Sequence, residues 1–175
     1  MNSRPKHIGF LQIYDEYYPK LYAYILARVR HRERAEDIVQ QTFVKAMQHF
    51  HSYKAKRGAT IGSWLFTIAK HTFLDEQKKI VKVSLVEDSA LEHLAPSIDS
   101  ALDILIELED DAVIKEEIVR MWKTIDTLTK EEQEVIRLKY IAGLSYKDIS
   151  ALTGVKPNTL AQLLRRALKK CQKAL

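Results

Sequence analysis

Apolar residues recur along this chain at the three- and four-residue spacing of helices, and no segment alternates as a strand does. Only 5 glycines and 4 prolines interrupt the pattern. The spacing predicts helices at 10–29 (ended or kinked at Pro19), 35–46, 61–79, 113–127, 130–142, 146–153 and 157–173. Residues 84–112 hold Ser, Asp, Glu and Pro96 instead, with room for a short helix near 102–108. The predicted fold class is all-α, with two small helical domains.

Three of these helices have an apolar stripe that predicts which face is buried. In the second helix the stripe comprises Ile38, Val39, Thr42, Phe43 and Ala46. In the third it comprises Trp64, Leu65, Ile68 and Leu74. In the last it comprises Leu160, Leu164, Ala167, Leu168 and Cys171. Thr129 with Glu132 forms a capping-box pattern that begins the helix at residue 130.

Local signals in the last third of the chain predict a helix-turn-helix. Ser145 and Asp148 have the spacing of a capping box, so a helix begins at Tyr146. Gly154 can take the left-handed conformation that ends a helix, and Pro157 suits the first turn of the next one. A turn of about three residues sets two helices roughly perpendicular. An ordinary helical hairpin is the alternative, and the basic second helix favours DNA binding.

Charge divides the chain into three segments. Residues 1–83 carry 15 Lys and Arg against 7 Asp and Glu, residues 84–112 carry none against 9, and residues 113–175 carry 13 against 7. Two basic blocks flanking an acidic connector indicate two modules that bind a polyanion. We therefore expect domains at 1–83 and 113–175, joined by a linker at 84–112.

The composition also bounds location and chemistry. The single cysteine, Cys171, fits a reducing cytoplasm, and no apolar run or leader predicts membrane insertion or export. His49 and His51 lack further ligands at metal-site spacing, so we expect no metal and no cofactor. No nucleophile pattern or phosphate-binding glycine loop is present. We expect a protein that is not an enzyme.

Two groups of motifs resemble those of the extracytoplasmic-function (ECF) sigma factors, a small class of bacterial sigma factors. The stretches 35–43 (AEDIVQQTF) and 64–70 (WLFTIAK), followed by Asp75 and Lys78-Lys79, resemble sigma region 2. The stretches 128–133 (LTKEEQ) and 144–149 (LSYKDI) resemble region 4. The motifs occur in the family's order and spacing across most of the chain.

The resemblance implies a dissociable subunit that directs bacterial RNA polymerase to promoters. In such proteins the helix matching 35–50 binds the clamp helices of the β′ subunit, and region 4 binds other core subunits. The implied core-binding residues are Asp37, Gln40, Gln41 and Lys45. The other implied partners are promoter DNA and an anti-sigma factor.

The loop at 51–60 and the helix after it correspond to the reader of the minus-ten element. Cations hold phosphates there while unstacked bases are captured. The implied residues are Lys54, Lys56, Arg57, Lys70, His71, Lys78 and Lys79. His71 stands where the family usually has asparagine, and imidazole offers a different set of donors and acceptors.

The last helix corresponds to the reader of the minus-thirty-five element. Side chains near a recognition helix's N-terminus reach base edges, and later basic residues hold phosphates. The implied residues are Lys156, Asn158, Thr159, Gln162, Arg165, Arg166 and Lys169. Ala161 and Leu163 replace the Lys and Arg common in the family, so weak binding by this module alone is expected.

Other interpretations remain open. The acidic segment is either a nucleic-acid mimic within the polymerase or a solvated tether. The whole chain is alternatively a stand-alone dimeric helix-turn-helix regulator that binds palindromic operators without polymerase. A helical enzyme or metal-dependent hydrolase would need a residue constellation that the sequence does not offer.

Overall fold

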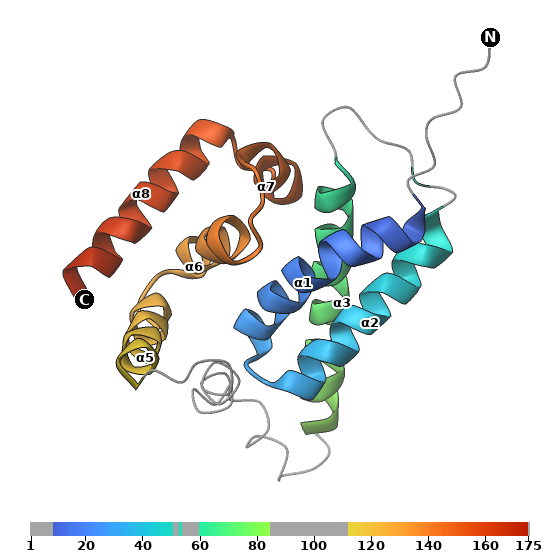
Figure 1. Cartoon of the computed structure of the whole chain (residues 1–175), viewed down its shortest axis with the longest axis horizontal. Coiled ribbons are helices and arrows are strands. Elements are labelled where there is room, and N and C mark those ends of the chain that lie inside the picture. Colours follow the sequence, from blue (N-terminus) through green and yellow to red (C-terminus); the bar gives the residue numbers. More distant parts are fainter. Residues whose placement is uncertain (1–8, 51–52, 54–59, 85–111, 175) are drawn as a thin grey trace.

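The computed structural model describes residues 9–50, 53, 60–84 and 112–174, and every element in those ranges is helical (Figure 1). The N-terminal helices are α1 (Phe10–Val29), α2 (Arg32–His49) and α3 (Ile61–Ser84). The C-terminal elements are α5 (Ala112–Asp126), α6 (Lys130–Ile136), the π-helical turn η2 (Arg137–Ile141), α7 (Tyr146–Thr153) and α8 (Pro157–Ala174). The all-α prediction is confirmed. The suggested helix at 102–108 lies outside the described residues.

Helix α1 runs without a break through Pro19, although proline removes one backbone donor. Ile13 before the proline and Leu21 after it are both buried in the same core, so burial on both sides holds the helix together. Arg30 then takes a left-handed conformation (φ 50°) that ends α1 and turns the chain into α2.

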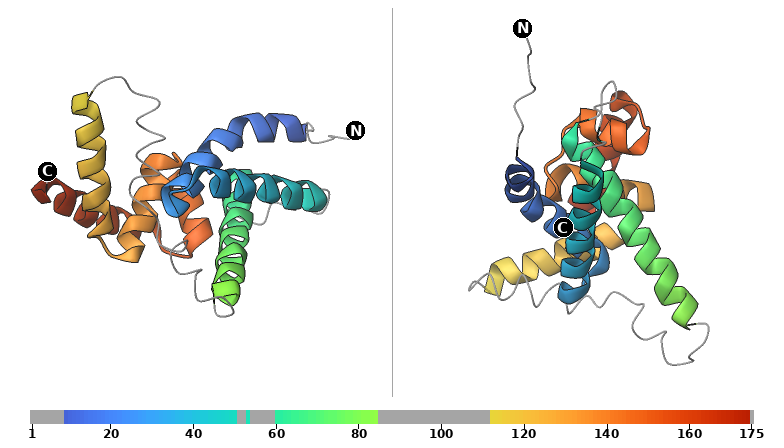
Figure 2. Two further views of the ribbon diagram at one scale, coloured as in Figure 1. Left: turned by 90° about the horizontal axis from the view of Figure 1, so that it is seen from below. Right: turned by 90° about the vertical axis from the view of Figure 1, so that its right-hand side faces the viewer.

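Helix α2 presents its predicted stripe to α1 and α3, and all five of its stripe residues are buried. Figure 2 shows that α3 runs across the other two helices rather than alongside them. Gly62, near the start of α3, is packed against Tyr17 of α1. A Cβ at this position would lie 2.9 Å from the ring atom Cε1 of Tyr17, so no larger residue fits without moving the ring.

The predicted caps of the C-terminal half are all present. Thr129 and Ser145 each accept from the backbone three residues on, and Glu132 and Asp148 each bond back to the cap. Gly154 ends α7 with φ 74°. The expected single helix over 130–142 instead widens at Arg137 into a π turn, closed by a 2.8 Å bond from the Ala142 amide to the Arg137 carbonyl.

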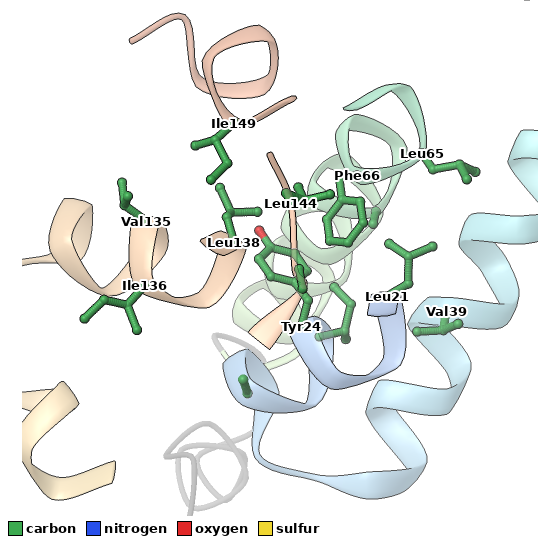
Figure 3. Close-up of a cluster of buried hydrophobic side chains, with 14 of the residues drawn as sticks. Leu21, Tyr24, Val39, Leu65, Phe66, Val135, Ile136, Leu138, Leu144 and Ile149 are labelled. Atoms are coloured by element: carbon green, nitrogen blue, oxygen red, sulfur yellow. The ribbon is translucent and has the colours of Figure 1, made fainter. Parts of the chain in front are cut away.

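The two halves share one continuous apolar core (Figure 3). Tyr24 of α1 and Phe66 of α3 are fully buried, with ring centroids 5.2 Å apart. Leu138 of η2 and Ile149 of α7 are also fully buried and face this pair from the C-terminal half (Figure 3). Burial of such side chains contributes roughly 1.5–3 kcal/mol each, so the two halves are held by more than surface contacts.

Polar contacts surround the shared core. The Tyr24 hydroxyl donates to the Glu134 carboxylate at 2.7 Å and accepts from Arg28 at the same distance. Arg30 pairs with Asp126, and the Thr60 hydroxyl donates to Asp148. Each of the last two contacts joins an N-terminal residue to the C-terminal half.

Two predicted core positions are wrong. Leu74 of α3 is 41% exposed and Leu168 of α8 is 38% exposed. Both lie at the edge of an apolar stripe, where spacing alone does not say how far the partner helix reaches. Phe66 and Ala69 are buried in α3 instead.

Candidate nucleic-acid interface

Helix α8 has one face in the core and one facing outward. Leu160, Leu164 and Ala167 are buried, as expected. The structure leaves all the residues predicted for minus-thirty-five recognition exposed: Lys156, Asn158, Thr159, Gln162, Arg165, Arg166 and Lys169. Leu163 packs against the core, whereas Ala161 is exposed. Of these two apolar positions, only Ala161 therefore lies on the outward face of α8.

Four of these residues form a cationic hollow. Gln162, Arg165, Arg166 and Lys169 line a surface depression of about 420 Å³. Arginine and glutamine can both read base edges bidentately, and lysine binds phosphates as a point charge. The arrangement suits a polyanion better than a small apolar ligand.

A second hollow on the other side of Arg165 contains two residues that the sequence interpretation missed. Tyr140 and Tyr146 are 57% and 38% exposed, and they line this space with Ala161 and Leu168. Lys139 lies 4.9 Å from the Tyr146 ring centroid. Their surroundings depend on how η2 packs beside α8, which no local pattern indicates.

The orientation of α8 is set by its supports. The Thr153 hydroxyl donates to the Ile149 carbonyl at 2.7 Å and accepts from the Val155 amide at 3.3 Å, which fixes the turn after Gly154. At the far end, Lys170 donates to both oxygens of the buried Glu132 carboxylate at 2.8 Å. This bond lowers the pKa of Glu132, against the opposing effect of burial.

The described part of the candidate minus-ten surface is the outer side of α3. His71, Lys78 and Lys79 are exposed and Lys70 is half-buried. Lys54, Lys56 and Arg57 lie outside the described residues. Near the start of α3, Tyr53 and Trp64 are both half-buried, with ring centroids 4.8 Å apart. Tyr53 was not singled out from the sequence, and Trp64 was named there as a core-facing motif residue rather than as a surface for bases.

The predicted core-binding residues divide into two groups. Asp37, Gln40 and Gln41 are exposed along one face of α2. Lys45 instead turns toward α3, donating to Thr72 at 3.1 Å and lying 3.7 Å from an Asp75 oxygen. Val44 and Met47, which are 50% and 55% exposed, complete the outward face and were missed. Exposed apolar residues beside polar ones are typical of a protein-binding surface.

Two further features were looked for in the described part of the chain. No group of three or more His, Cys, Asp or Glu side chains gathers there as metal ligands would. None of the described helices combines the length and apolarity that a membrane span requires.

These features define a class: an all-helical DNA-binding protein with a helix-turn-helix at one end and a basic three-helix unit at the other. Comparison with known families makes the assignment specific. Residues 13–81 match the family model Sigma-70 region 2, and residues 118–171 match Sigma-70, region 4. The chain belongs to the ECF group of RNA polymerase sigma factors, as its motifs predicted.

Individual relatives are similar over nearly their full length. The chain is 31% identical over 162 residues to RNA polymerase sigma factor YlaC of Bacillus subtilis, covering 90% of this chain and 88% of that one. It is 26% identical over 156 residues to ECF RNA polymerase sigma factor SigM of the same organism, covering 89% and 88%.

Among solved structures, the sigma factor RpoE of Bartonella quintana, in complex with the anti-sigma factor NepR, has the same fold. Its TM-score is 0.70 at 24% identity, covering 94% of this chain and 95% of that one.

Proposed function

We propose that this chain directs RNA polymerase to promoters by binding the core enzyme through α2, the minus-ten element through α3 and the minus-thirty-five element through α8. The single observation that carries the proposal is the presence of both basic readers, α3 and α8, in a chain whose two ends match sigma regions 2 and 4. The division into 1–83, 84–112 and 113–175 is part of this proposal.

The residue assignments rest on exposure and chemistry. Asp37, Gln40 and Gln41 share an outward face with Val44 and Met47, which gives α2 both polar and apolar contacts for a protein partner. Exposed Lys78 and Lys79 supply phosphate contacts along α3. The paired rings of Tyr53 and Trp64 offer the kind of aromatic surface on which an unpaired base stacks.

In the structure the minus-ten reader α3 contacts α7, the helix that precedes the minus-thirty-five reader α8. Thr60, directly before α3, is hydrogen-bonded to Asp148 in the first turn of α7. By their names the two elements are centred about 25 base pairs apart on a promoter, which is roughly 85 Å at ~3.4 Å per pair. The packed arrangement must therefore open before both elements are bound by one chain.

The same proposal covers partners and location. A subunit of this kind works in the cytoplasm with core polymerase and carries no catalytic chemistry of its own. The solved RpoE structure contains an anti-sigma factor. We infer that this chain also has an anti-sigma partner.

The test is transcription with bacterial core polymerase and a promoter library. We expect run-off transcripts that require this chain, and we expect their loss when Arg165 and Arg166 are both changed to Gln. The paired control changes the exposed Lys123 of α5 to Gln, which leaves the readers intact. Tight operator binding without polymerase, together with no dependent transcript, would instead establish the stand-alone regulator.

A further inference from the structure

A cationic pocket lies where the two halves meet, away from the outward face of α8. Its volume is about 570 Å³, and the lining residues come from α1, α3, α5, α6 and η2. Four of them are cations: Arg28, Arg30, Lys130 and Arg137. Asp126 is the one carboxylate among the described lining residues, and it is already paired with Arg30.

Arg137 and Arg30 are the two buried cations of this pocket. The side chain of Arg137 is 9% exposed, and Gln133 accepts from its Nη2 at 2.9 Å. Its buried Nε has no hydrogen-bond partner. Burial and the neighbouring charge of Arg28 lower the pKa of Arg137, against the opposing effect of the Glu134 charge. Burying a hydrogen-bond donor without an acceptor costs free energy. A buried donor that also lies next to other cations favours an anionic ligand.

Two of the remaining cations are held in place around it. Arg28 stacks over the Phe73 ring at 4.7 Å from its centroid and bonds to Glu134 at 3.4 Å. Arg30 lies over the Trp122 ring at 5.5 Å. Lys130 is exposed at the edge of the pocket. Fixed guanidinium planes with spare donors match the geometry of phosphate oxygens.

We propose that this pocket binds a small molecule bearing phosphate groups, with Arg137 and Lys130 as its principal contacts. The volume exceeds that of one inorganic phosphate and falls within the range of about 300–1,000 Å³ typical of small-molecule sites. Because the lining comes from both halves, the ligand stabilises their packed arrangement. The binding claim does not depend on the proposed role in transcription.

The experiment is calorimetric titration of the full chain with sodium pyrophosphate, ATP and adenosine at constant ionic strength. We expect one saturable site per chain for pyrophosphate or ATP, no binding of adenosine, and a higher melting temperature with ligand. Whether ATP binds more tightly than pyrophosphate distinguishes a nucleotide from a simple polyphosphate as the source of the phosphate.

Variants locate the site. Arg137→Lys keeps the charge but loses the planar fork, so we expect binding to weaken about tenfold. Lys130→Gln, an exposed change that preserves folding, should weaken it about threefold. Lys123→Gln, which removes a cation outside the pocket, should leave binding unchanged.

Three results would overturn the proposal. One is the absence of saturable pyrophosphate or ATP binding at millimolar concentration. Another is loss of binding in Arg166→Gln but not in Lys130→Gln, which would place the anion on α8. The third is an equal effect of Lys130→Gln on binding of a short DNA duplex, which would make nucleic acid the ligand.

Discussion

The phenol of Tyr24 in α1 donates a 2.7 Å hydrogen bond to the carboxylate of Glu134 in α6, across 110 residues of sequence. Tyr24 is completely buried, and burial together with the Glu134 charge raises its pKa, so it stays a neutral donor. Arg28 bonds to both partners. This triad fixes the first helix of the N-terminal half against the C-terminal half.

Changing Tyr24 to Phe should loosen that junction. The substitution keeps the ring in the core but removes a donor from a carboxylate whose other oxygen is buried without a partner. We expect a loss of about 1–3 kcal/mol in the free energy of unfolding, measured by urea denaturation. Tyr22→Phe, at a half-buried tyrosine of the same helix, serves as the control. Equal stability of the Tyr24 variant and the wild type would show that the hydrogen bond does not hold the halves together.

Acid should weaken the support of α8 through Glu132. Its lowered folded-state pKa means that ionisation contributes stability above its unfolded pKa of about 4.3, and that this stability is lost as pH falls through the folded pKa. Lys170→Met removes the largest cause of the shift, so the acid-unfolding midpoint should move to higher pH. At neutral pH the cost should be only about 1 kcal/mol, because Lys170 is 53% exposed. Lys173→Met is the matched control, and identical acid midpoints for the two variants would contradict the assignment.

Gln162 should read a base edge. Its replacement by Ala is expected to cost ~1–3 kcal/mol of discrimination at one base pair of the minus-thirty-five element. Binding of all single-base variants of the promoter by the reconstituted holoenzyme measures this. Lys173→Ala, at the exposed end of the same helix, should leave the preference intact. A Gln162→Ala holoenzyme with wild-type preference at every position would remove this residue from base reading.

Lys78 should act on phosphates without regard to sequence. Lys78→Ala is expected to weaken promoter binding uniformly and to reduce the slope of log K against log salt by about 1. Salt titrations on two unrelated promoters provide the measurement, with Lys20→Ala on α1 as the control. A loss confined to one promoter sequence would mean that Lys78 contacts a base.

The features predicted from the sequence are those set by neighbouring residues. Thr129, Ser145 and Gly154 act on the backbone within a few positions, so spacing alone placed the helix ends they form. The exposure of the polar residues along α8 followed from helical periodicity in the same way, whereas that of Leu168 did not. Lys45 shows the limit: its periodicity puts it on the outer face of α2, but its long side chain reaches Thr72 on α3.

The junction between the halves could not be predicted, because its partners are distant in sequence and each has an ordinary alternative. From the sequence, Tyr24 is expected to be an ordinary aromatic residue of the core, and Glu134 is expected to be an ordinary exposed acid of a charged helix. The π turn at Arg137 likewise has no local signature. It nonetheless directs Arg137 into the cationic pocket and Leu138 into the shared core.

The continuous core through Tyr24, Phe66 and Leu138 also sets how much of the protein is available to a partner that needs the halves apart. Such a partner binds only the open fraction of molecules, so its apparent Kd equals the intrinsic Kd divided by that fraction. Each ~1.4 kcal/mol by which the packed form is favoured raises the apparent Kd about tenfold. Substitutions in this core, far from any DNA contact, would therefore change how many chains a fixed pool of polymerase can recruit.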